Sequence, residues 1–350
     1  MPLETPSPRL PNAPLAARRA ALFRETPAET LERWTLGTAW NLKPARIAGI
    51  PPLLRAVFSD LIRPRDGLPD PEQALRAPAG LCGIARDLSV PTVVKAYERG
   101  LFPFAHLGPL KWFSPPERCV LFLDEFRISK DARRMMRQAR YTVTFDRDFE
   151  GVVKACAGRR GGKWHVTWIT PRVMRIFAAL FDAGHVHSFE VWNQAGELVG
   201  GGYGLAAGGV FFTESQFSHA SNSSKVGFAV LNWHLAKWGY TLNDGKYAAP
   251  ALFDMGFRMI PRAELQEHLQ HQHLHHQHLH HPNGESRKPG RWELETDLAT
   301  VAAWQPGQAP TEAAVTTAKA KTKAPPKKKK AAGAASSTVD TVGIPEAAAS

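Results

Sequence analysis

The segment between His187 and Glu214 constrains the fold more than any other part of the sequence. It contains three apolar-rich stretches separated by turn residues at Asn193–Gly196 and Ala206–Gly209: His187–Trp192, Glu197–Leu205 and Val210–Glu214. Strands joined by such short turns run antiparallel. The segment therefore predicts a three-stranded meander, and its apolar face must be covered by another layer of the fold.

Helix signals lie on both sides of this meander. Ser89 can cap a helix that begins at Pro91 and ends before Gly100, because Pro is favoured at the first helical position and Gly just past the end. Ser129 can cap a second helix, and Thr170-Pro171 begins a third that Gly184 ends. These helices are the expected cover of the sheet.

A further helix is expected to open at Asn222 or Ser223, and its apolar positions recur at helical spacing (Val230, Leu231, Leu235, Trp238). Further strands are predicted at 141–145, at 241–243 ending at Asp244, and at 257–260. This order predicts an α/β or α+β sheet with helices packed on it, with parallel neighbours where a helix links two strands.

Composition narrows the class of protein. The 350 residues carry a net charge of +12, of which the lysine-rich stretch after Pro310 supplies a part. A basic body with a basic tail favours a polyanionic partner, nucleic acid before membrane. The sequence holds three widely spaced cysteines and no continuous run of about 18 apolar residues. A cytoplasmic protein without a disulfide framework is therefore expected.

Common catalytic motifs are missing from the sequence. It has no nucleophile elbow, no Cys/His signature and no phosphate-binding loop. The glycines between Gly200 and Gly209 precede another predicted strand, so they favour turns over a dinucleotide site. The eight histidines at 268–281 follow no metal-ligand spacing and are interpreted as low complexity.

Two carboxylates stand out because each is predicted to end a strand, where loops open a crevice. Glu214 follows Phe211-Phe212-Thr213, and Asp244 follows Leu242-Asn243. Either residue could instead be an ordinary capping or surface carboxylate. The aromatic residues around Phe104 and Trp168 are similarly open to two interpretations, as core fillers or as the wall of a pocket for an apolar or base-stacking ligand.

Seven segments in register resemble the leucyl/phenylalanyl-tRNA–protein transferase family. They are, in chain order, Ala96-Tyr97-Glu98-Arg99-Gly100-Leu101-Phe102-Pro103-Phe104, Trp112-Phe113-Ser114-Pro115, Thr167-Trp168-Ile169-Thr170, His185-Val186-His187-Ser188-Phe189-Glu190-Val191-Trp192, Glu197-Leu198-Val199-Gly200-Gly201-Gly202-Tyr203-Gly204, Glu214-Ser215-Gln216-Phe217-Ser218 and Asn222-Ser223-Ser224-Lys225. They lie between Ala96 and Lys225, within a family-like stretch at 71–262 that is about 190 residues long and makes up a little over half of the chain.

The resemblance implies an acetyltransferase-like (GNAT) domain at residues 151–262, joined to a smaller N-terminal subdomain at 71–150. Around these lie a partly disordered extension at 1–70, a His-rich segment at 263–304 and a disordered basic tail at 305–350. The implied activity is transfer of Leu or Phe, and Met less well, from aminoacyl-tRNA to a protein with N-terminal Arg or Lys. The product is a degradation signal. No separate cofactor is expected, because the tRNA ester is the activated donor.

The resemblance also implies roles for individual residues. Phe104 and Trp168 match aromatic positions near the 3′ adenosine of the tRNA. Glu214 matches an acidic residue of the reaction cleft, and Asp244 matches a carboxylate that handles the attacking amine. The last group matches the amino-acid pocket or its surroundings: Ser224, Val230, Leu231 and Phe217.

Lys246 marks a departure from the family, which usually has Gln at this position. Gln can donate and accept hydrogen bonds, whereas Lys only donates and adds a charge. Lys246 could bind a tRNA phosphate, stabilise the oxyanion, or repel an Arg or Lys acceptor. Two alternatives therefore stay open beside the leading hypothesis: a divergent aminoacyl-tRNA-dependent transferase with another acceptor, and a non-catalytic tRNA-binding protein.

Overall fold

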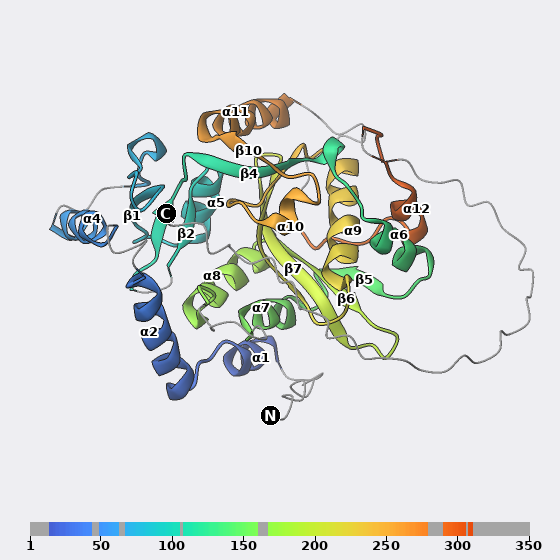
Figure 1. The fold of residues 1–350 in the computed structure, drawn as a ribbon, viewed down its shortest axis with the longest axis horizontal. Helices are drawn as coiled ribbons and strands as arrows, with labels where there is room; N and C mark the ends of the chain where they lie inside the picture. The colour runs from blue at the N-terminus through green and yellow to red at the C-terminus, as the bar shows by residue number, and fades with distance from the viewer. Residues whose placement is uncertain are drawn as a thin grey trace, which may run out of the picture.

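Two β-sheets and the helices around them make up the described part of the chain, as Figure 1 shows for the computed structural model. The structure describes residues 14–43, 49–62, 67–105, 108–159, 167–278, 290–305 and 307–310. The mixed α/β class predicted from the sequence is confirmed. Its acetyltransferase-like character and the domain boundaries stay predictions.

The larger sheet has seven strands in the order β10-β4-β9-β8-β7-β6-β5. Their bounds are β4 Glu117–Phe122, β5 Thr142–Phe145, β6 Val186–Trp192, β7 Leu198–Ala207, β8 Val210–Ser218, β9 Leu242–Asp244 and β10 Arg258–Pro261. The predicted meander is β6-β7-β8, and all its pairs are antiparallel. β8 and β9 are parallel and are linked by helix α9 (Ser223–Lys237), which matches the expected crossover.

Helices cover both faces of this sheet. On one face α5 (Val90–Glu98), α7 (Phe149–Ala157) and α8 (Pro171–Asp182) bury an apolar cluster. On the other face α6 (Lys130–Arg137), α9 and α12 (Leu298–Ala303) bury a second cluster. The side chains of Ser129 and Thr170 cap α6 and α8 as predicted, because each accepts a hydrogen bond from a backbone N–H in the first turn.

The smaller sheet has the order β1-β3-β2, with β1 at Leu81–Ile84, β2 at Phe102–Phe104 and β3 at Lys111–Phe113. The sequence patterns did not predict these short strands, nor β4, α7 and α12. β4 and β5 lie in the range expected for the N-terminal subdomain, yet both pair within the larger sheet.

In the described part of the chain before the small sheet, three helices occur: α1 (Leu15–Leu22), α2 (Pro27–Asn41) and α4 (Ile50–Ile62). α1 lies against α7 in Figure 1. Arg19 pairs with Glu150 of α7 over 3.0 Å, and Phe23 is buried in the cluster beneath. Helix α1 therefore belongs to the packed body.

After the last strand come α11 (Arg262–His278) and a segment at 290–305 that contains α12. Trp292 and Trp304 of this segment are buried in the α9-side cluster, a role that no sequence pattern indicated. Short helical turns complete the chain at Pro71–Gln73, Leu123–Glu125 and Pro250–Phe253. The side chains of the histidine run from 271 onwards, and the lysine-rich tail, lie outside the described residues.

Candidate active site

The three residues expected to carry chemistry lie together in a buried polar network. Glu214 comes from β8, Asp244 ends β9, and Lys246 follows two residues later. The Lys246 Nζ lies 2.6 Å from Glu214 Oε1, and each of these side chains is only 1% exposed. The same Nζ donates to the backbone carbonyl of Thr213 over 3.0 Å. Lys246 therefore points into the protein.

Tyr97 of α5 completes the Glu214 end of the network. Its hydroxyl donates to Glu214 Oε1 over 2.6 Å. Burial, and then the neighbouring Glu214 carboxylate, raise the pKa of Tyr97 well above its ordinary value, so the phenol stays protonated as a donor. Burial lowers the pKa of Lys246, although Glu214 partly offsets this effect by favouring the charged ammonium. The Lys246 ammonium therefore gives up its proton more readily than the ammonium of a surface lysine.

Asp244 is held by a second cation, Arg118 of β4. An Arg118 Nη2 contacts Asp244 Oδ2, and both side chains are fully buried. Arg118 Nη1 also donates to the Gly100 carbonyl over 2.6 Å, and the Lys246 N–H donates to Asp244 Oδ1 over 2.7 Å. The network therefore contains two carboxylates and two basic side chains, with no excess of either sign.

A β-bulge explains how Glu214 reaches this network. The β7–β8 register places Tyr203 opposite Ser215 and Gly204 opposite Thr213, so Glu214 is the extra residue. A bulge re-aims the side chain at that point. The expectation that Glu214 ends its strand was wrong, because β8 continues to Ser218. Asp244 does end β9, as predicted.

The network also marks the place where β8 and β9 separate. The two strands pair only over Val210–Phe212 and Leu242–Asp244, and beyond this point β8 pairs with β7 alone. The Thr213 carbonyl that Lys246 binds is the first group past the shared ladder. On the α9 side of the same point, Thr213 donates to Asn243, which in turn donates to Asn232 of α9.

Two buried hydroxyls near Glu214 have no hydrogen-bond partner among the described residues: those of Tyr203 and Ser215. Tyr203 packs its ring against Phe177 at 5.3 Å and against Phe149 at 6.0 Å. Buried polar atoms are almost always satisfied. Such atoms beside a charged network are what a site for a polar ligand requires.

The aromatic residues expected at the tRNA end are also brought together. The rings of Phe104 and Trp168 lie 5.8 Å apart, although their segments are separated by more than 60 residues. Phe113 of β3 packs on Phe104 at 5.8 Å and on Phe102 at 6.4 Å. This aromatic group belongs to the same apolar cluster as Phe217, on the α5 side of the sheet.

The remaining predicted pocket residues lie on α9. Ser224 is buried in its first turn, and Val230 and Leu231 are buried in its middle, in the cluster on the opposite face of the sheet. The structure therefore groups the nine predicted residues in two sets. Six lie on the α5 side (Phe104, Trp168, Glu214, Phe217, Asp244, Lys246), and three lie on α9.

Four residues of the site were not singled out from the sequence: Tyr97, Arg118, Tyr203 and Ser215. Three of them lie inside the family-like motifs, where no sequence signal distinguished them from the neighbouring core residues. Arg118 did carry a signal, because a charged residue directly before Cys119-Val120-Leu121 is unusual in a buried strand. Within the described ranges, no group of three or more His, Cys, Asp or Glu side chains could hold a metal ion.

The part of the chain that contains this site is also the part that matches known proteins. The family model described as leucyl/phenylalanyl-tRNA protein transferase matches residues 120–270, and the model of its N-terminal domain matches residues 86–116. A leucyl/phenylalanyl-tRNA–protein transferase of Azotobacter vinelandii is 47% identical over 210 residues, which cover 59% of this chain and 92% of that protein. The Pseudomonas syringae pv. syringae protein of the same name is 47% identical over 202 residues, covering 57% and 87%.

A solved structure described as that of L-PGS from Bacillus licheniformis aligns with 43% of this chain and 47% of that one. The TM-score is 0.27 at 15% identity, too low to support an inference. No helix in the described part of the chain is both long and apolar enough to cross a membrane.

Proposed function

The chain belongs to the leucyl/phenylalanyl-tRNA protein transferase family, and from this premise we propose that it moves Leu or Phe, and Met less well, from aminoacyl-tRNA to the N-terminal Arg or Lys of a protein. An aminoacyltransferase that acts between aminoacyl-tRNA and protein is what the relatives support; the amino acid and the acceptor residue are the proposal. The product would mark the acceptor for degradation.

The reaction is aminolysis of an ester. The neutral α-amine of the acceptor attacks the ester carbonyl, the new C–N bond forms, and the C–O bond to the ribose breaks. One proton leaves the nitrogen and one is delivered to the ribose oxygen, so the proton count balances. The enzyme must therefore position the two substrates, stabilise the oxyanion and move a proton.

The donor side of the proposal rests on the aromatic pair and on the separation of β8 from β9. Phe104 and Trp168 would hold the terminal adenosine, where each stacked base contributes about 1–3 kcal/mol. The aminoacyl group would enter where the two strands part, between Phe217 on one face and the α9 residues on the other (Ser224, Val230, Leu231). An apolar lining suits Leu and Phe.

The buried network is the single observation that carries the chemistry. Lys246 uses two of its three donors on Glu214 and Thr213, so one donor remains for the oxyanion. Asp244 and Glu214 would accept or relay the proton of the attacking amine. The hydroxyls of Tyr203 and Ser215, which have no hydrogen-bond partner in the described ranges, would bind the polar atoms of the aminoacyl group.

The same network favours a second candidate, a transferase whose acceptor has no cationic side chain beside its reacting amine. Glu214 already pairs with Lys246, and Asp244 already pairs with Arg118. An incoming Arg or Lys side chain would have to displace a buried cation to reach either carboxylate. An acceptor such as a peptide with a neutral N-terminal residue, a lipid amine or a small amine would not.

One assay separates these candidates. The protein is incubated with radiolabelled Phe-tRNA or Leu-tRNA and with peptides that begin with Arg, Lys or Ala, and with a small amine. Label on the Arg and Lys peptides alone supports the leading proposal, whereas label on the neutral acceptors supports the second. Binding of tRNA without transfer to any acceptor would indicate that the protein is a non-catalytic tRNA-binding protein.

A Lys246→Gln variant sharpens the result, since Gln keeps hydrogen bonding and removes the charge. If Lys246 blocks cationic acceptors, the variant gains transfer to Arg peptides relative to Ala peptides. If Lys246 mainly stabilises the oxyanion, kcat falls for every acceptor alike. Tyr141→Phe, directly before β5, is the control for loss of one part-buried hydrogen bond, which the Tyr141 hydroxyl donates to the Ser221 carbonyl over 2.9 Å.

A further inference from the structure

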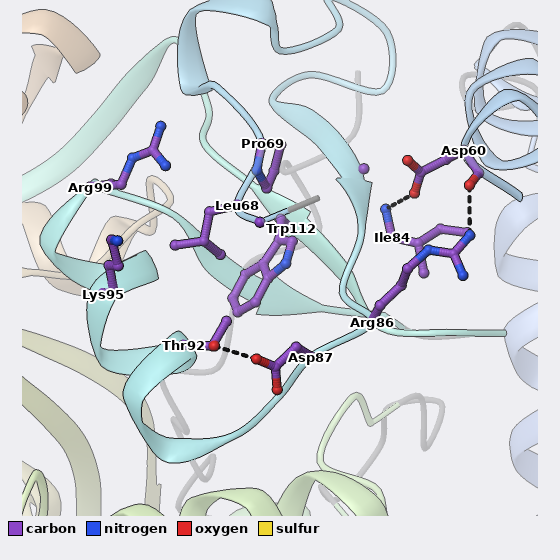
Figure 2. Close-up of a pocket in the computed structure, with 12 residues that line it drawn as sticks. Asp60, Leu68, Pro69, Ile84, Arg86, Asp87, Thr92, Lys95, Arg99 and Trp112 are labelled. Carbon is purple, nitrogen blue, oxygen red and sulfur yellow. Dashed lines mark hydrogen bonds between the residues drawn. The ribbon is translucent and has the colours of Figure 1, made fainter. Parts of the chain in front are cut away.

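A pocket of about 270 Å³ lies outside the network just described, between α5, the small sheet and the chain at Gly67–Pro69. Figure 2 shows Leu68 and Pro69 on one side of it, Trp112 near its centre, and Lys95 and Arg99 together at one end. Glu214, Asp244 and Lys246 do not line it. The pocket is therefore a separate feature of the N-terminal part of the molecule.

Helix α5 separates the pocket from the active-site network. Thr92, Lys95 and Arg99 line the pocket and recur at helical spacing, so they share one face of the helix or its end. Tyr97, on another face, is fully buried and donates to Glu214. The two sites thus lie on opposite sides of one helix.

The small sheet separates the pocket from the aromatic pair in the same way. Neighbouring residues of a strand point to opposite faces. Phe113 of β3 packs on Phe104, while the adjacent Trp112 lines the pocket. One layer of sheet therefore lies between the proposed adenosine site and the pocket.

Charge is unevenly distributed in the pocket. At one end Arg86 donates to the backbone carbonyl of Asp60 over 2.6 Å, and the Asp60 carboxylate accepts from the Ile84 N–H over 2.9 Å. The Asp87 carboxylate accepts hydrogen bonds from the Ser89 backbone N–H and the Thr92 hydroxyl. At the other end, the side chains of Lys95 and Arg99 form no hydrogen bond or ion pair with any residue that the structure describes. That end therefore carries two positive charges that no acidic side chain of the described residues pairs with.

We propose that this pocket binds a phosphate of the tRNA 3′ strand, close to the terminal nucleotide held by Phe104 and Trp168. Lys95 and Arg99 would contact the phosphate, and the apolar wall of Leu68, Pro69 and Trp112 would face the sugar and base. The inference rests on the proposed function for its ligand, because a tRNA donor brings a phosphate backbone to this end of the molecule.

The test is a Lys95→Gln/Arg99→Gln double variant in the full chain, with Arg24→Gln/Arg291→Gln as a control that removes the same charge from two exposed positions. Binding of tRNA is measured across a salt series, and transfer kinetics are measured at one salt. Loss of this one phosphate contact should reduce the slope of log K against log salt by about 0.7 relative to wild type. KM for aminoacyl-tRNA should rise about tenfold with kcat nearly unchanged.

Three results would overturn the inference. The first is a salt slope and KM equal to those of the control. The second is a loss of kcat alone, which would show that the variant disturbs α5 and the network behind it. The third is saturable binding of inorganic phosphate or AMP that depends on Lys95 and Arg99 while the tRNA slope is unchanged, which would assign the pocket to a small phosphate ligand.

The two proposals can fail separately. If wild-type protein transfers label and the double variant behaves like the control, only the pocket inference fails. If wild-type protein transfers nothing but its tRNA affinity still depends on Lys95 and Arg99, only the transferase function fails. Equal melting temperatures of the double variant and wild type confirm that the fold is intact.

Discussion

The buried guanidinium of Arg118 forms an ion pair with the Asp244 carboxylate. Arg118 has no exposed surface and bonds both Asp244 and the Gly100 carbonyl. We expect Arg118→Met to lower the free energy of unfolding by about 3–5 kcal/mol, because it leaves a buried carboxylate unpaired. Urea denaturation at neutral pH measures this loss.

The matched comparison is Arg118→Met/Asp244→Asn, which removes both charges. Its loss should be clearly smaller than the sum of the two single losses, since the pair is coupled. Additive losses would show that Arg118 acts through packing, for instance on the Phe102 ring 5.1 Å away.

Glu190 of β6 gives a prediction about pH. Burial raises its pKa to about 7, although Ser188 and Thr144 each donate to it over 2.6 Å and act in the opposite direction. The folded protein therefore holds this proton more tightly than the unfolded chain. The associated stability is present below about pH 4.5 and is lost as the pH rises through 7.

We expect wild type to lose up to ~3 kcal/mol more than Glu190→Gln between pH 5 and pH 8. Chemical denaturation of both proteins across this range measures the difference. Parallel curves for the two proteins would mean that Glu190 ionises normally in the fold.

At the scale of elements, the sequence allowed prediction wherever a local signal existed. The caps at Ser129 and Thr170, the glycine that follows α8 and the alternation of β6–β8 are local, and each was predicted near its observed place. The strands of the small sheet are only three or four residues long. Such strands are too short for a period-2 pattern and depend on their neighbours.

In the candidate site, too, the features with a local sequence signal could be predicted and the others could not. The carboxylates, the aromatic pair and Lys246 could be named from the sequence because they stand in recognisable motifs. The bulge at Glu214 and the pairing of Lys246 with it could not be, since both depend on the register of β7 against β8. Register is a property of two strands together, and a one-residue change reverses which face a side chain takes.

The docking of α1 is a further feature of elements that the sequence did not indicate. Phe23 is 3% exposed in the cluster beneath α7 and α8. We expect Phe23→Ala to weaken this docking by about 3–4 kcal/mol, so that residues 15–25 become much more sensitive to limited proteolysis. Leu15→Ala, at a position that is half exposed, is the control and should leave the cleavage rate unchanged.

At the scale of the whole molecule, both ends of the described chain contribute to its two apolar clusters. Phe23 lies in the α5-side cluster, and Trp292 and Trp304 lie in the α9-side cluster. The Trp292 ring stacks on His187 at 3.7 Å, and the Trp292 backbone N–H donates to the Asp146 carboxylate over 2.7 Å. The segment at 290–305 is therefore integral to the fold, although low-complexity sequence surrounds it.

Two truncations test this assignment. Ending the chain after residue 289 removes both tryptophans together with Val301, and it leaves the Asp146 carboxylate without its Trp292 partner. We expect a loss of more than ~5 kcal/mol in the free energy of unfolding, because deletion of one buried large aromatic side chain alone costs about 3–5 kcal/mol. Ending the chain after residue 310 keeps all of these contacts and should leave the melting temperature unchanged.

The comparison is made by thermal and chemical denaturation of both truncated proteins beside the full chain. Trp292→Ala in the full chain separates the loss of the side chain from the loss of the segment, and it should account for about half of the effect. Equal stability of the two truncated proteins would mean that 290–305 is only loosely attached, and the α9-side cluster would then have to be stable without it.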